Sequence, residues 1–149
     1  MYGLPKRERL HLKKHIDELF AQGKGFVAYP LRVMYQTMPP SESGEGTETA
    51  PTARAMMMVS VGKRYFRRAN KRNRVKRLIR EAYRLNKHLW IEWLEREGLY
   101  GRIALMFVGK ELPEYKDIER AVLKAFTRLT DPNREQTKPS EALPTKTDI

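Results

Sequence analysis

Hydrophobic residues recur every three or four positions near the start of the chain and again after residue 114. The first stretch is followed by Gly23, which ends a helix well, and its apolar stripe consists of Leu12, Ile16, Leu19 and Phe20. The second stretch, about residues 114–129, has a stripe that consists of Ile118, Ala121, Val122, Ala125, Phe126 and Leu129. These spacings predict two amphipathic helices, each with one face turned to a core.

Segments between these helices alternate in polarity with the period of two that is typical of β-strands. Residues 31–37 place Leu31, Val33, Tyr35 and Thr37 on one face. Residues 54–61 place Met56, Met58 and Ser60 on one face and Met57, Val59 and Val61 on the other. Residues 26–29 are a shorter candidate strand, and the apolar run 103–108 predicts a strand buried on both faces. We expect 31–37 and 54–61 to pair as a hairpin.

A long helix with two contrasting faces is predicted after the strand at 54–61. With 100° per residue, one direction collects, within about 60°, Val75, Leu78, Ile79, Ala82, Leu89, Trp90 and Trp93. About 160° away lie Asn73, Arg77, Arg80, Arg84 and Lys87, and Arg72, Arg74 and Lys76 lie on the flanks. One face is therefore expected to pack on the sheet, and the other to present a row of guanidinium groups.

Two stretches have nothing to bury. Residues 39–53 are small, polar and acidic, and residues 131–149 carry three prolines among Thr, Lys and Glu. Both compositions predict disorder. The remainder is one folded domain, residues 1–130, with the acidic loop inside it and the tail after it.

Charge is the strongest compositional signal. The chain has 149 residues, with 30 Lys and Arg against 18 Asp and Glu, so its net charge is +12. Twelve basic residues and a single acidic one, Glu81, lie between Lys63 and Lys87. Such a density favours a polyanionic partner, nucleic acid before acidic membrane, and the excess of arginine suits bidentate phosphate contact.

The sequence lacks the residues that a membrane protein, a metal-binding protein or a protein with a phosphate-binding loop would need. No cysteine is present, and no apolar run approaches the roughly 18 residues of a membrane span, so we expect a soluble protein of the cytoplasm. His11 and His15 have the spacing of a metal pair but no third ligand nearby, so a surface or RNA-proximal position is expected for both. Gly44 and Gly46 lie in an acidic tract that would repel phosphate. The sequence therefore predicts neither catalytic residues nor a metal site.

The segment from Lys71 to Tyr83, KRNRVKRLIREAY, resembles the signature of the bacterial ribonuclease P protein subunit, in which an RNR tripeptide opens a KRxxRE helix. Further segments are similar to the same family, so that the resemblance covers about residues 6 to 129: 6–10, Ile16 with Phe20, 33–35, 59–64 and 103–110.

The resemblance implies an α+β fold of order α-β-β-β-α-β-α. This is a two-layer sandwich on a mixed four-stranded sheet, with a left-handed βαβ crossover also seen in ribosomal proteins. It implies a surface for the catalytic RNA made of Lys71, Arg72, Asn73, Arg74, Lys76, Arg77, Arg80 and Arg84. It also implies a cleft between the first helix and the sheet for the single-stranded 5′ leader of precursor tRNA, made of Phe20, Val33, Tyr35, Ser60, Gly62 and Lys63.

The function that the resemblance implies is that of a non-catalytic protein subunit of an endoribonuclease that removes the tRNA 5′ leader. The RNA subunit would carry catalysis with Mg²⁺ that it mainly binds itself, with one protein per catalytic RNA. Two alternatives stay open. A ribosomal or other structural RNA-binding protein would explain the charge but not an aromatic leader cleft. A metal-dependent nuclease acting alone would need a carboxylate cluster.

Overall fold

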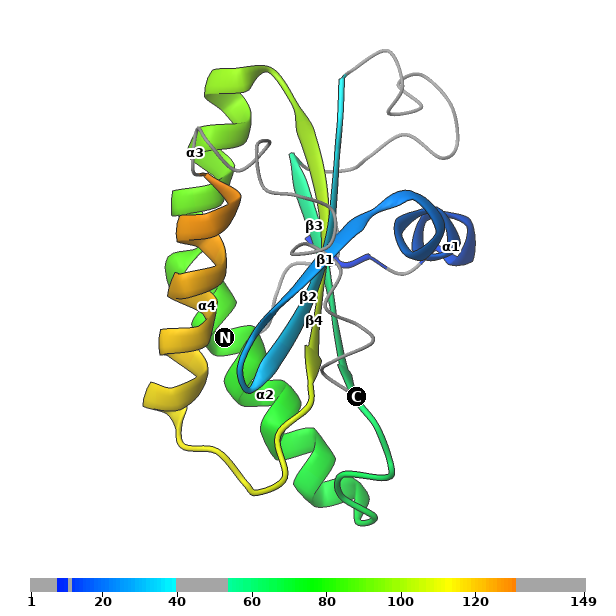
Figure 1. Cartoon of the computed structure of the whole chain (residues 1–149), viewed down its shortest axis with the longest axis vertical. Helices are drawn as coiled ribbons and strands as arrows, with labels where there is room; N and C mark the ends of the chain where they lie inside the picture. The colour runs from blue at the N-terminus through cyan, green and yellow to red at the C-terminus, as the bar shows by residue number, and fades with distance from the viewer. Residues whose placement is uncertain (1–7, 11, 40–53, 131–149) are drawn as a thin grey trace.

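The computed structural model describes residues 8–10, 12–39 and 54–130 (Figure 1). The predicted disorder of 39–53, apart from Pro39, and of the tail 131–149 lies outside these residues. The elements in chain order are α1 (Lys13–Gln22), β1 (Lys24–Ala28), β2 (Leu31–Met38), β3 (Ala55–Val61), α2 (Ala69–Asn86), α3 (His88–Glu97), β4 (Tyr100–Phe107) and α4 (Tyr115–Leu129).

The four strands form one mixed sheet, which confirms the α+β class. The helices α2, α3 and α4 cover one face of this sheet, and α1 lies on the other face as a partial further layer (Figure 1). The predicted apolar stripe of α4 is buried throughout, and the helix begins with a capping box between Glu114 and Asp117. Both terminal helices are therefore found as predicted, but the predicted stripe of α1 is confirmed only in part: Leu19 is fully buried, whereas Leu12 and Phe20 are 36% and 44% exposed.

The strand order is β1-β2-β4-β3, and it corrects one prediction. Strand β2 runs antiparallel to both β1 and β4, whereas β3 runs parallel to β4. The expected hairpin between residues 31–37 and 54–61 is wrong, because β4 lies between β2 and β3. Since β4 is largely buried on both faces, it suits a central position in the sheet, and α2 with α3 carries the chain back so that β3 and β4 are parallel.

The main core lies between the sheet and the helices α2, α3 and α4. It holds an aromatic group in which the Trp90 ring stacks on Phe126 at 6.3 Å between centroids and Tyr83 meets Phe126 edge-on at 5.9 Å. Trp90 also presses on the β4 backbone, because a Cβ built on Gly101 would come within 2.7 Å of its ring. The absence of a side chain at Gly101 thus lets α3 approach the sheet closely.

The long basic helix is interrupted at Lys87, contrary to the prediction of one helix through Trp93. Helix α2 ends at Asn86, whose side-chain amide donates to the Ala82 carbonyl at 2.9 Å, and α3 begins at the next position but one. The predicted apolar face is confirmed for Val75, Ile79, Ala82 and Trp90. Leu89 is instead 42% exposed, because the interruption turns it away from the core.

Candidate nucleic-acid interface

The outer face of α2 carries most of the cations that the sequence predicted there, whereas Lys87 lies past the end of the helix and pairs with Glu8. Its apolar side is held against the core by Val75 and Ile79, which are fully buried. The opposite side is therefore turned to solvent, and five of the eight predicted residues are exposed: Lys71, Asn73, Arg74, Arg77 and Arg80. Lys76 is partly buried beside them. No carboxylate among the described residues forms an ion pair with Arg74, Arg77 or Arg80.

Two of the predicted cations have structural partners. Arg72 donates to the carbonyls of Phe66 at 2.9 Å and Arg67 at 2.8 Å, so it holds the loop that precedes α2. Arg84 donates to the Glu81 carboxylate at 2.8 and 3.3 Å, and this pairing offsets its charge. The charge available to a partner is therefore concentrated between Lys71 and Arg80, in the N-terminal two thirds of α2.

The start of α2 adds to this positive field. No acidic residue stands in its first turn, and the Arg68 side chain makes no capping hydrogen bond. Cations at the positive end of a helix dipole repel one another and the dipole, whereas a bound anion there is stabilised. This end of α2 therefore suits phosphate.

Arg9, which is distant from α2 in the sequence, also belongs to the basic surface of α2. A groove of about 940 Å³ is lined by Arg9, Asn73, Lys76, Arg77, Leu78, Arg80 and Glu81. Arg9 was not among the predicted site residues, because only the fold brings it to α2. A second basic recess, of about 490 Å³, is lined by Lys63, Arg64 and Arg67 where the chain leaves β3.

The predicted leader cleft is corrected in part. Val33 is fully buried and Tyr35 is 8% exposed, and both belong to the main core under α2 and α4. The Tyr35 ring meets Phe26 edge-on at 5.9 Å. Because side chains alternate along β2, these two residues point away from α1, and Phe20 cannot form a cleft with them.

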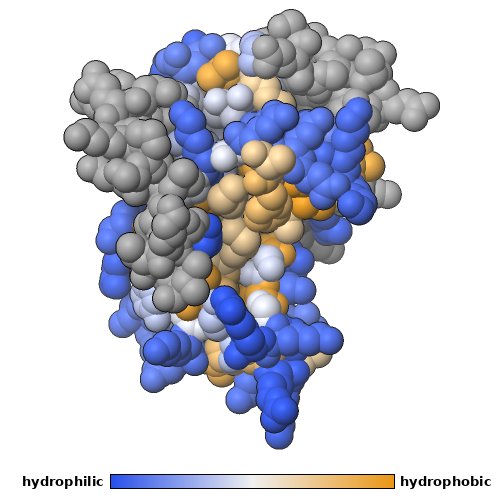
Figure 2. All heavy atoms as spheres, turned by 45° about the vertical axis from the view of Figure 1, so that its right-hand side comes forward, coloured by the Kyte–Doolittle hydropathy of each residue, from blue (hydrophilic) through white to orange (hydrophobic). Residues whose placement is uncertain are grey.

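The other face of the sheet, beside α1, carries a different set of side chains. The β-ladders place Arg32, Met106 and Ser60 side by side on three neighbouring strands, and Met58 lies next along β3. Met58 and Met106 are partly buried above Leu19, Met34 and Met56, and Phe20 on α1 is 44% exposed. We call the set Phe20, Arg32, Met58, Ser60 and Met106 the methionine strip. Figure 2 shows this side of the molecule, with apolar atoms gathered between hydrophilic surfaces.

The buried polar side chains between α1 and the sheet have structural roles. Arg102 is 3% exposed and donates to Glu18 at 2.8 Å and Gln36 at 3.1 Å, which links α1 to the sheet. His15 is also 3% exposed, so its predicted surface position is wrong, whereas His11 lies outside the described residues. Within the described residues there is no group of three or more His, Asp or Glu able to hold a metal, and no helix there is long and apolar enough to cross a membrane.

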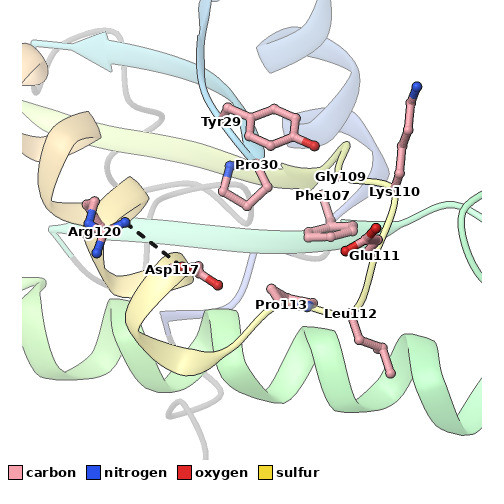
Figure 3. A pocket seen from close by; sticks show the side chains of 10 residues that line it. All are labelled: Tyr29, Pro30, Phe107, Gly109, Lys110, Glu111, Leu112, Pro113, Asp117 and Arg120. Atoms are coloured by element: carbon pink, nitrogen blue, oxygen red, sulfur yellow. Dashed lines mark ion pairs between the residues drawn. The ribbon is translucent and has the colours of Figure 1, made fainter.

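A further recess lies at the end of β4, where the turn between β1 and β2 meets the loop before α4 (Figure 3). Its volume is about 410 Å³, and its lining includes Tyr29, Pro30, Lys110, Glu111, Asp117 and Arg120. Arg120 faces Asp117 at 3.9 Å. Two cations and two carboxylates balance, so this recess has no preference for phosphate.

The fold and the α2 surface define a class of protein: an α+β protein that presents a basic helix to a polyanion. The family model described as Ribonuclease P matches residues 4–130. The Ribonuclease P protein components of two Porphyromonas gingivalis strains are each 49% identical over 128 residues, which are 86% of this chain and 87% of theirs. The chain therefore belongs to the ribonuclease P family, as a protein component of that enzyme.

Two solved structures share the fold. The RNase P protein from Thermotoga maritima has a TM-score of 0.58 at 20% identity, covering 81% of this chain and 96% of that one. The Staphylococcus aureus RNase P protein has a TM-score of 0.57 at 17% identity, covering 83% of this chain and 95% of that one. These structures share the arrangement of helices and sheet and agree with the predicted α+β class, while the predicted left-handed crossover stays a prediction.

Proposed function

We propose that this chain binds the RNA subunit of ribonuclease P through the outer face of α2 and assists removal of the 5′ leader from precursor tRNA. The observation that carries the proposal is the row of exposed cations Arg74, Arg77 and Arg80 on a helix whose other face is locked into the core. Arginine binds phosphate through two parallel hydrogen bonds, and phosphate contacts supply most of the affinity for a folded RNA. The surface therefore fits the backbone of a structured RNA.

In this proposal the RNA subunit carries out the chemistry of leader removal. The α2 surface consists of cations, which attract phosphate and repel Mg²⁺, so its contribution is to bind and to offset backbone charge. Metal ions held by RNA would activate the water and stabilise the leaving oxygen. The protein is thus a positioning subunit of the holoenzyme, in the proportion of one protein to one RNA.

This division of labour predicts that the purified chain with Mg²⁺ and no RNA leaves precursor tRNA intact. Adding the cognate RNA at physiological Mg²⁺ should restore cleavage at the mature 5′ end, which gel electrophoresis of labelled precursor would show. Cleavage by the chain alone would contradict the proposal and favour a protein nuclease.

The methionine strip is proposed to bind the single-stranded leader. Unpaired bases stack on aromatic side chains, and a thioether packs well against an aromatic ring. The exposed Phe20 ring and the sulfurs of Met58 and Met106 offer such a surface, and Lys63 lies just past the end of β3.

The leader proposal predicts that Phe20→Ala lowers the affinity of the reconstituted holoenzyme for precursor tRNA. Loss of one stacked base costs about 1–3 kcal/mol, which is roughly 5- to 150-fold in Kd. Binding of mature tRNA, which has no leader, should stay unchanged. Equilibrium binding of both RNAs to the holoenzyme, measured in Ca²⁺ to prevent cleavage, gives the comparison.

Tyr29→Ala is the matched control, because Tyr29 is 66% exposed but lies at the recess beside α4. It should affect the two RNAs equally. If the unmodified holoenzyme binds precursor and mature tRNA with equal affinity, the leader proposal fails and a structural RNA-binding role is favoured.

A further inference from the structure

The segment at residues 8–10 is fastened to the fold at two points. The Leu10 N–H donates to the Met57 carbonyl at 2.8 Å, and Arg9 pairs with Met57 in a parallel bridge, so the segment extends the sheet beyond β3. The Lys87 ammonium donates to the Glu8 carboxylate at 2.5 Å. This second contact joins positions 79 residues apart in the sequence.

The Glu8–Lys87 ion pair is largely buried. The Glu8 side chain is 10% exposed and the Lys87 side chain 23% exposed. Tyr83 lies close by, and its pKa is raised by burial and by the negative charge of Glu8. A pair withdrawn from water in this way contributes little net stability, but loss of one partner leaves an uncompensated charge, so the geometry is held firmly.

Arg9 lies between these two fixed points and lines the groove along α2 with Asn73, Lys76, Arg77 and Arg80. A long side chain contributes more to binding when its backbone is already held, because ordering the backbone on binding costs conformational entropy. The two attachments remove that cost before RNA arrives.

We propose that Glu8 is a positioning residue for RNA binding: through its ion pair with Lys87 it holds Arg9 against the basic surface of α2. The inference rests on the proposed function of that surface. The Glu8 carboxylate is negative, so its charge alone would weaken the binding of RNA, whereas its positioning role strengthens it. Because these two effects have opposite signs, removing the charge of Glu8 tests the inference.

The test measures Kd for the cognate ribonuclease P RNA as a function of KCl concentration, with the full chain and its variants. Arg9→Ala should reduce the slope of log K against log salt by about 0.7–0.9, which near 0.1 M salt is roughly a five- to eightfold loss of affinity. Glu8→Gln should weaken binding by a similar factor. If charge alone mattered, Glu8→Gln would tighten binding, and that result overturns the inference.

Further variants separate positioning from a general loss of structure. The double variant Glu8→Gln with Arg9→Ala should bind no more weakly than Arg9→Ala alone, and an additive loss would contradict the inference. The charge exchange Glu8→Lys with Lys87→Glu should recover affinity. Asp17→Asn is the matched control, because Asp17 forms an exposed ion pair with Lys13 on α1 and its loss should not weaken binding.

The outcome also distinguishes this inference from the proposed function. If Arg80→Ala lowers the salt slope while Glu8→Gln does not weaken binding, the α2 surface stands and only the positioning role fails. If neither Arg80→Ala nor Arg9→Ala changes the slope, the RNA surface itself is misassigned. Circular dichroism at the binding temperature checks that each variant is folded.

Discussion

Replacing Arg74, Arg77 and Arg80 together with alanine is expected to weaken binding of the chain to its cognate ribonuclease P RNA by a few hundredfold near 0.1 M salt. Each side chain is exposed on α2, and each phosphate contact releases counterions from the RNA. Three lost contacts should lower the slope of log K against log salt by about 2–3. Filter binding over a series of KCl concentrations measures both quantities.

The single variants Arg74→Ala and Arg80→Ala should each lower the slope by about 0.7–0.9.

The control removes the same charge from other elements. Arg96 on α3 and Lys116 and Lys124 on α4 are exposed, so their triple alanine variant has the same net charge as the α2 variant. Its salt slope should remain near that of the unmodified chain. Equal slopes for the two triple variants would show that overall charge, rather than the α2 surface, determines binding.

Trp90→Ala is expected to lower the free energy of unfolding by about 3–5 kcal/mol, a large part of the total for a domain of this size. The Trp90 side chain is fully buried, stacks on Phe126 and fills the space above Gly101. Truncation leaves a cavity between α3, α4 and β4 that these elements cannot close without separating from the sheet. Urea unfolding followed by circular dichroism measures the change.

Leu89→Ala on the same helix is the matched control. Leu89 is 42% exposed because α2 and α3 are separated at Lys87, so its truncation should cost less than about 1 kcal/mol. A cost equal to that of Trp90→Ala would mean that Leu89 is buried. That result would favour one uninterrupted helix over the two that are observed.

The side chains of β2 that face α1 could be predicted only in part from the sequence. The alternation in residues 31–37 correctly placed Val33 and Tyr35 on one face of a strand, and both are in the main core. The family resemblance assigned the same two residues to the cleft beside α1, which the structure contradicts. Which face of β2 meets α1 depends on how the strand lies in the sheet, and a period of two cannot distinguish the faces when Arg32 and Met34 are the alternatives. Phe20 was predicted on the apolar stripe of the first helix, yet its ring is 44% exposed, and its role in leader binding stays a prediction.

Local patterns in the sequence determined the helices at either end, the strands and the two faces of α2, because helix and strand periods depend on neighbours within a few residues. The RNR segment also determined the family. Only the tertiary structure decided that β4 lies between β2 and β3, that Met58 and Met106 rather than Val33 and Tyr35 face α1, and that Arg9 joins α2. These outcomes depend on contacts between residues far apart in the chain, where burial of both faces of β4 and the pairing of Glu8 with Lys87 select one arrangement from several that the same elements allow.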